Sequence, residues 1–159
     1  MTYTKIKIHE PNLEVRKKSF LADEKISKED RTDMIEFLRL ASLGKINLRK
    51  KIGNSRLLKY IENLRVCFYY FKKPFSQITL RDMENFERDL SSNKIKNLRT
   101  NKPYSENTKC DFKKALKIYL KWKLRDNASK FAELTNWLDT IAKQKTPEYL
   151  KEEEVIKLY

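Results

Sequence analysis

Apolar side chains recur every three or four positions along most of this chain, and that spacing predicts α-helices. The clearest run steps by four, three, four and three residues through Leu57, Ile61, Leu64, Phe68 and Phe71. Only 2 glycines and 4 prolines occur among the 159 residues, too few for the turns of a hairpin-rich β fold. Hydrophobic residues make up 40% of the chain, enough for a small core. We therefore expect an all-α protein, a bundle of four to five helices.

Capping residues place these helices along the chain. The expected N-caps are Ser27, Thr79, Ser105 and either Asn54 or Ser55, and Gly44 is expected to end the first helix. The expected helices are 28–43, 55–72, one that follows Thr79 and buries Leu80, Met83, Phe86 and Leu90, 106–125, and a shorter one marked by Phe131, Leu134, Leu138 and Ile141. Residues 1–26 are expected to form an extended arm, 27–145 the helical domain, and 146–159 a linker that begins another helix.

The positive charge is concentrated in two segments of the chain. The formal net charge is +14, of which residues 45–73 carry +8 and residues 93–125 carry +9, so the remainder is slightly negative. Such concentration indicates one positive surface built from two elements, as expected for a protein that binds a polyanion. The alternative is a lysine-rich, solvated surface with no partner.

The composition argues against catalysis within this chain. His9 is the only histidine and lies in the expected arm, and Cys67 and Cys110 are 43 residues apart, so neither a zinc site nor a nucleophile–histidine pair is indicated. No glycine-rich nucleotide motif is present, and no apolar run is long enough to span a membrane. We expect a cytoplasmic protein without disulfides, cofactor, metal, membrane contact or small-molecule substrate.

A series of lysines follows the expected helix 106–125. Lys109, Lys113, Lys117 and Lys121 recur every four residues, with Lys114 beside them. The expected core face of this helix consists of Phe112, Ala115, Leu116, Tyr119 and Trp122. We expect the lysines to form a solvated ridge away from that face, so that charge reversal there barely affects folding.

Four stretches, in order, resemble the core-binding domain of tyrosine recombinases, the phage-integrase and Xer-type family. They are NSRLLKYIENLRVCFYYF, KPFSQITLRDMENFERDL, YSENTKCDFKKALKIYLKW and TPEYLKEEEVIKLY. The first three resemble helices of that domain, and the last resembles the peptide that opens the catalytic domain. The resemblance covers residues 27–159.

The resemblance implies an orthogonal SAM-like helical bundle that clamps duplex DNA at a recombination site, for DNA integration or recombination. It implies that the helices at 55–72 and 106–125 face the major groove and the phosphates, and that the full recombinase self-associates on DNA. The family's tyrosine nucleophile and its activating groups belong to a catalytic domain beginning near Glu148, so Tyr159 is not expected to be that nucleophile. The chain is then an excised domain or an N-terminal fragment, and not an enzyme in itself.

Phosphate contacts are expected from arginines and lysines of the two positive segments, helped by backbone N–H groups at helix starts capped by Ser55 and Ser105. Asn54, Asn107 and Thr108 are candidates for base contacts, and Arg56 for phosphate or guanine. The candidate DNA-binding residues are Arg49, Lys50, Lys51, Asn54, Ser55, Arg56, Lys59, Arg99, Lys102, Ser105, Asn107, Thr108, Lys109, Lys113 and Lys117. Two other functions fit the same residues: a helical adaptor that binds acidic partners, and a helical transcriptional regulator.

Overall fold

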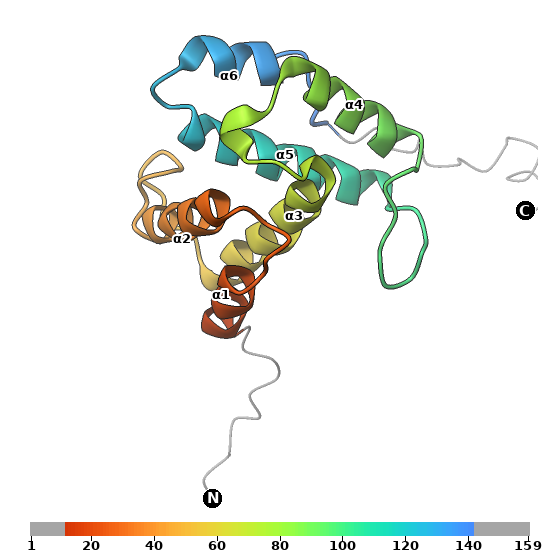
Figure 1. Ribbon diagram of the computed structural model, residues 1–159. Helices are drawn as coiled ribbons and strands as arrows, with labels where there is room; N and C mark the ends of the chain where they lie inside the picture. The colour runs from red at the N-terminus through yellow and green to blue at the C-terminus, as the bar shows by residue number, and fades with distance from the viewer. Residues whose placement is uncertain (1–11, 142–159) are drawn as a thin grey trace, which may run out of the picture.

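A computed structural model describes residues 12–141 of the chain, and this part is all-helical (Figure 1). The elements are α1 (Leu13–Leu21), α2 (Lys28–Ser42), α3 (Asn54–Phe71), α4 (Leu80–Ser91), α5 (Glu106–Lys123) and α6 (Ala128–Thr135), with a short 3-10 helix at Phe75–Gln77. Within residues 12–141 no strand forms, and only two isolated β-bridges occur. The expectation of an all-α bundle is confirmed.

Side-chain caps start three of the helices where the sequence predicts them. The Ser27 hydroxyl accepts a hydrogen bond from the Asp30 backbone N–H (3.1 Å), and Ser105 does the same for Thr108 (3.2 Å). Thr79 forms a reciprocal capping box with Asp82. Each cap satisfies backbone donors that the first helical turn leaves without partners.

The end of α2 is a Schellman turn at Gly44, as predicted. The Lys45 N–H donates to the Leu40 carbonyl (3.0 Å) and the Gly44 N–H to the Ala41 carbonyl (3.2 Å). Gly44 has φ +80°, and a Cβ at this position would lie 2.9 Å from the Arg49 carbonyl oxygen. Only glycine fits here without displacing the loop that follows.

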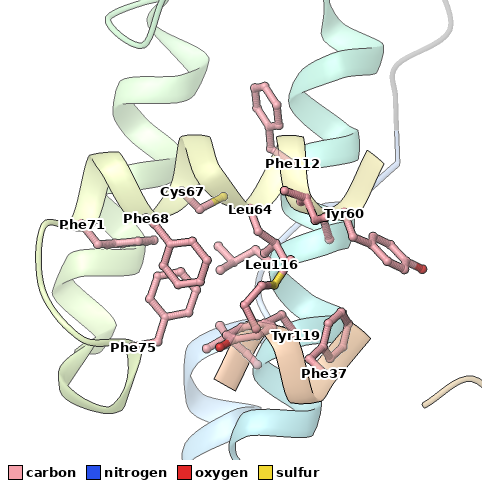
Figure 2. Packing of buried hydrophobic residues seen from close by; sticks show 14 of the residues in the cluster. Phe37, Tyr60, Leu64, Cys67, Phe68, Phe71, Phe75, Phe112, Leu116 and Tyr119 are labelled. Atoms are coloured by element: carbon pink, nitrogen blue, oxygen red, sulfur yellow. The ribbon is translucent and has the colours of Figure 1, made fainter. Parts of the chain in front are cut away.

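The core forms where α3 and α5 pack together, and α1, α2, α4 and α6 cover it (Figure 1). Figure 2 shows Leu64 and Phe68 of α3 in one cluster with Leu116 and Tyr119 of α5. The fully buried Tyr119 ring makes edge contacts with Phe68 at 5.7 Å between centroids and with Phe37 of α2 at 5.2 Å. Aromatic residues at helical spacing are therefore core here, and edge-to-face pairs add to their hydrophobic stabilisation.

The expected extended arm over residues 1–26 differs from the structure. Residues 13–21 form α1, and Phe20 is completely buried against Phe68 of α3, with 5.6 Å between ring centroids. The apolar positions of α1 do not recur at a regular helical period, so the sequence pattern did not predict this helix. Residues 1–11, including His9, and the expected linker at 146–159 lie outside the described residues.

The last helix is shorter than expected. α6 ends at Thr135, and while Leu134 and Leu138 are buried, Ile141 is largely exposed and does not belong to the core. Beyond Thr135 the Leu138 N–H still donates to the Thr135 carbonyl (3.1 Å), so a single turn carries Leu138 into the core.

Both cysteines are free and buried in the bundle. Burial raises the pKa of the Cys67 thiol well above its usual range. No disulfide joins the two cysteines.

Two basic loops lie at opposite ends of α5 (Figure 1). The loop between α2 and α3 shares a hollow with Lys121 and Trp122 near the end of α5. The loop between α4 and α5 leads into the start of α5 and closes with a bridge between Lys96 and Pro103.

Candidate nucleic-acid interface

The two positive segments of the sequence meet in a groove between α3 and α5. Arg56 and Lys59 come from the first two turns of α3, and Lys114 and Lys117 come from the middle of α5. The hollow has a volume of about 240 Å³, and we call it the α3–α5 groove. Because α3 and α5 are the most closely packed pair of helices in the core, their outer faces hold these four cations in a defined arrangement.

The groove contains a single carboxylate, that of Asp111. Its Oδ2 lies 2.9 Å from Lys59 Nζ, an exposed ion pair that contributes little to stability. Arg56, Lys114 and Lys117 have no ion pair within residues 12–141. The apolar part of the lining consists of Tyr60, Ala115 and Ile118. Asn63 adds a side-chain amide on the α3 side.

A second basic hollow continues the groove toward the end of α5. Ile118 lines both hollows, and Lys45, Lys121 and Arg125 provide the charges of the second one, which no acidic residue lines. The Arg125 guanidinium lies 5.0 Å from the centroid of the Trp122 ring and donates to the Trp122 carbonyl oxygen (2.9 Å). This contact holds the Arg125 side chain in place.

The start of α3 differs from the starts of the other long helices. Gly53 is the N-cap and no side chain caps this end, so the prediction that Asn54 or Ser55 caps α3 is wrong. The first turn contains no acidic residue but does contain Arg56, whereas α2, α4 and α5 each have an acidic residue there. A helix N-terminus carries partial positive charge, so a cation beside it raises the local positive potential.

The predicted solvated ridge is wrong for Lys109 and Lys113. Lys109 is only 4% exposed, and its Nζ donates to Asn93 Oδ1 (2.6 Å) and Glu106 Oε1 (3.0 Å). Lys113 is 8% exposed, with Nζ 3.4 Å from Glu87 Oε2 of α4. Both lysines join α5 to α4 and to the residues just after it, and neither faces the groove.

Helical geometry explains this error. Steps of four residues rotate about 40° each around an α-helix, so Lys109 and Lys121 lie about 120° apart. In contrast, Lys114 and Arg125 are three turns apart and lie within about 20° of each other around the helix axis. Lys117 and Lys121 lie between them on the same side of the helix. That spacing was present in the sequence and would have identified Lys114, Lys121 and Arg125, which the prediction of site residues omitted.

The remaining predicted residues are exposed but dispersed. Arg49, Lys50 and Lys51 lie on the loop between α2 and α3, and Arg99 and Lys102 on the loop between α4 and α5. The structure does not bring these two sets into the α3–α5 groove.

The other predicted site residues at the starts of α3 and α5 also lie outside the α3–α5 groove. Asn54 lines a separate hollow with Glu14 and Lys17 of α1, away from the groove. The Thr108 hydroxyl is 2.9 Å from the Ser105 hydroxyl within the cap of α5, so both groups already have partners, while Asn107 and Ser55 are exposed.

The charged groups of the groove are mainly cations. Within residues 12–141 no cluster of His, Cys, Asp and Glu could hold a metal ion. Over the same range, no helix is both long enough and apolar enough to cross a bilayer. The chemistry available in the groove is charge-assisted hydrogen bonding to an anion by Lys and Arg.

Comparison with protein-family models, with curated proteins and with solved structures found no match for this chain.

Proposed function

We propose that this chain is a DNA-binding module that holds the phosphate backbone of duplex DNA in the α3–α5 groove. One observation carries the proposal: Arg56 and Lys59 from one positive segment and Lys114 and Lys117 from the other converge around a single carboxylate. A row of cations in which only Lys59 has an acidic partner suits a polyanion, and phosphate contacts supply most of the affinity of sequence-independent DNA binding.

We further propose that the module is the core-binding domain of a tyrosine recombinase that integrates or recombines DNA. The sequence resemblance implies that the helices at 55–72 and 106–125 face DNA, and α3 and α5 are the helices that form the groove. In this role the chain binds DNA without cleaving it, and strand exchange belongs to a catalytic domain of the full recombinase.

The two alternative functions have less support from the groove. A helix-turn-helix regulator would present α4 to DNA, yet the charged residues of α4 are mainly acidic. An adaptor for acidic partners would use the same cations, but a long basic surface that continues from Arg56 to Arg125 suits an extended polyanion better than a short peptide.

Binding to a fluorescent 24-base-pair duplex, measured by anisotropy over a range of salt concentrations, tests the proposal. If about six phosphates are neutralised, log K falls with log salt at a slope near −5. Affinity should also rise with duplex length, because a longer duplex offers more overlapping sites. Binding that does not depend on salt, or no binding at low salt, would contradict the proposal.

The charge-reversed variant Lys114→Glu, Lys117→Glu locates the surface. Losing two phosphate contacts lowers the magnitude of the salt slope by about 2, and repulsion by the new carboxylates weakens binding further. The matched control, Lys18→Glu with Lys28→Glu, makes the same charge change at exposed positions of α1 and α2. If the control loses as much affinity as the groove variant, the groove is not the binding surface.

A further inference from the structure

The turn that connects α2 to α3 has an unusual backbone for its residues. The Lys50 N–H donates to the Asn47 carbonyl (2.7 Å), and between them Leu48 and Arg49 have φ of 45° and 66°. Positive φ at both central residues defines a type I′ turn, which strongly prefers Asn-Gly. Leu and Arg in this conformation are strained, and such strain persists only where the surrounding structure maintains it.

The structure around this turn, which we call the Leu48–Arg49 turn, does maintain it. On one side, the Arg49 carbonyl lies against the backbone of Gly44, where no Cβ would fit. On the other side, Ile52 is buried and its N–H donates to the Ala41 carbonyl of α2 (3.1 Å). The turn is thus fixed at both ends against the end of α2.

The strain does not serve the core. Leu48 is 89% exposed, the highest value for any large apolar side chain within residues 12–141. The hollow beside it contains Lys45, Lys121 and Arg125 and continues into the α3–α5 groove. The fold thus holds a leucine in solvent, followed by an arginine, at the edge of the basic surface.

The same tripeptide stands at the tip of the other basic loop. Asn97, Leu98 and Arg99 repeat the order of Asn47, Leu48 and Arg49, and Leu98 is 85% exposed. Here the Asn97 side chain accepts from the Arg99 N–H (2.9 Å) and fixes the tip. Two loops of different length and geometry therefore present an exposed leucine followed by an arginine, at opposite ends of α5 (Figure 1).

We propose that the Leu48–Arg49 turn inserts into the minor groove of duplex DNA, with Leu48 wedged against a base step and Arg49 in the groove. This proposal rests on the proposed DNA-binding function and adds to it a site that deforms the duplex. The narrow minor groove concentrates negative potential that attracts arginine, and apolar wedges partly unstack a base step. The charged residues that line the hollow beside Leu48 are all cations, Lys45, Lys121 and Arg125, and cations suit the phosphates on either side of a minor groove.

The test uses duplexes that contain 2-aminopurine, a base analogue whose fluorescence rises when it unstacks. Saturation with the unmodified protein should raise this fluorescence. The variant Leu48→Asn retains Arg49 and places at position 48 a residue that tolerates positive φ. It should raise the melting temperature by about 2–5 °C, because the turn strain is relieved. It should also lose the fluorescence rise and bind DNA about three- to tenfold more weakly, with an unchanged salt slope.

The matched control is Leu21→Asn, at an exposed leucine at the end of α1 and away from the basic surface. It should keep both the fluorescence rise and the affinity. Salt-dependent binding without a fluorescence rise, or full retention of affinity and fluorescence by Leu48→Asn, would overturn the insertion proposal and leave the proposed function standing. Absence of any DNA binding at low salt would instead overturn the proposed function itself.

Discussion

The lysines of α5 fall into two groups, which differ in how far they are buried and in whether they form ion pairs. Lys109 and Lys113, in the first half, are buried and paired with groups of α4, its following residues and the first turn of α5. Lys123, at the end of the helix, is nearly buried and paired with Glu29 and Asp33 of α2. Lys114 and Lys121 are exposed and have no ion pair within residues 12–141. Lys113 and Lys114 are adjacent in sequence, yet about 100° of helical rotation separates a structural cation from a cation available to a ligand.

The difference follows from desolvation. A buried charge is tolerated only when it is paired and hydrogen-bonded, so Lys109 and Lys113 are bound to their partners and contribute to the fold. An exposed lysine retains its hydration and exchanges counterions freely, so it can neutralise a phosphate with little cost. Positive charge along a helix therefore indicates a binding surface only where the side chains are solvated.

The largest expected effect is on the buried side of this comparison. Lys113→Glu would place a second carboxylate beside Glu87, with both groups largely removed from water. Breaking a buried ion pair costs about 3–5 kcal/mol, so we expect the free energy of unfolding to fall by that amount in urea denaturation. Lys109→Glu should also destabilise the fold, because it buries a carboxylate at a position that is only 4% exposed, but by less, since its partner Glu106 is exposed.

A double substitution serves as the control for this prediction. Lys113→Met alone leaves Glu87 without its partner, whereas Lys113→Met with Glu87→Leu replaces the pair by apolar groups and should recover most of the lost stability. If Lys113→Glu unfolds at the same urea concentration as the unmodified protein, Lys113 is solvated and the division of α5 into two groups is wrong.

A smaller effect is expected at a second pair on the α4 side. The Tyr70 hydroxyl donates to Asp89 Oδ2 (2.7 Å), and this hydrogen bond holds the pKa of Asp89 below its usual range. Burial, and then the same hydrogen bond, raises the pKa of Tyr70 to about 12. Because the pKa of Asp89 is lowered in the folded state, its stabilising contribution is present above the unfolded pKa and is lost as pH falls through the folded value.

Tyr70→Phe tests this linkage. We expect the variant to be about 1 kcal/mol less stable at pH 7, the contribution of a hydrogen bond to a charged group that is partly screened by water. The difference should vanish in acid, below the folded pKa of Asp89, when urea denaturation is repeated across pH. A difference that is constant with pH would mean that the hydroxyl stabilises the fold through packing alone.

The smallest effect on stability is expected on the exposed side. Lys114→Glu with Lys117→Glu should change the free energy of unfolding by no more than about 0.5 kcal/mol, although it is the variant expected to weaken DNA binding strongly. Thermal melting of this variant beside Lys113→Glu compares the two groups directly. A large loss of stability in the groove variant would show that these lysines are structural too.

The sequence was sufficient where local rules decide the structure. The caps at Ser27, Thr79 and Ser105 and the end at Gly44 depend on a few neighbouring residues, and all four predictions are confirmed. The apolar period of α3 likewise predicts its buried face.

The sequence was insufficient where contacts between distant residues determine the structure. α1 is held by burial of Phe20 against α3, a contact that no local pattern encodes. The burial of Lys109 depends on the position of Asn93, 16 residues away, and could not be read from the charge of α5. The sequence predicted one positive surface built from two segments, but which lysines line the α3–α5 groove depends on the rotation of α5 about its axis.

The burial of the two cysteines makes the protein well suited to site-specific spectroscopy. Cys67 and Cys110 are enclosed by the bundle, so maleimide dyes and spin labels that react with exposed thiolates will leave them unmodified while the protein is folded. A single cysteine introduced at an exposed position can then be labelled without removing the native ones. The rate at which the native thiols are modified then reports how often the core opens, because each thiol can react only when the helices around it separate.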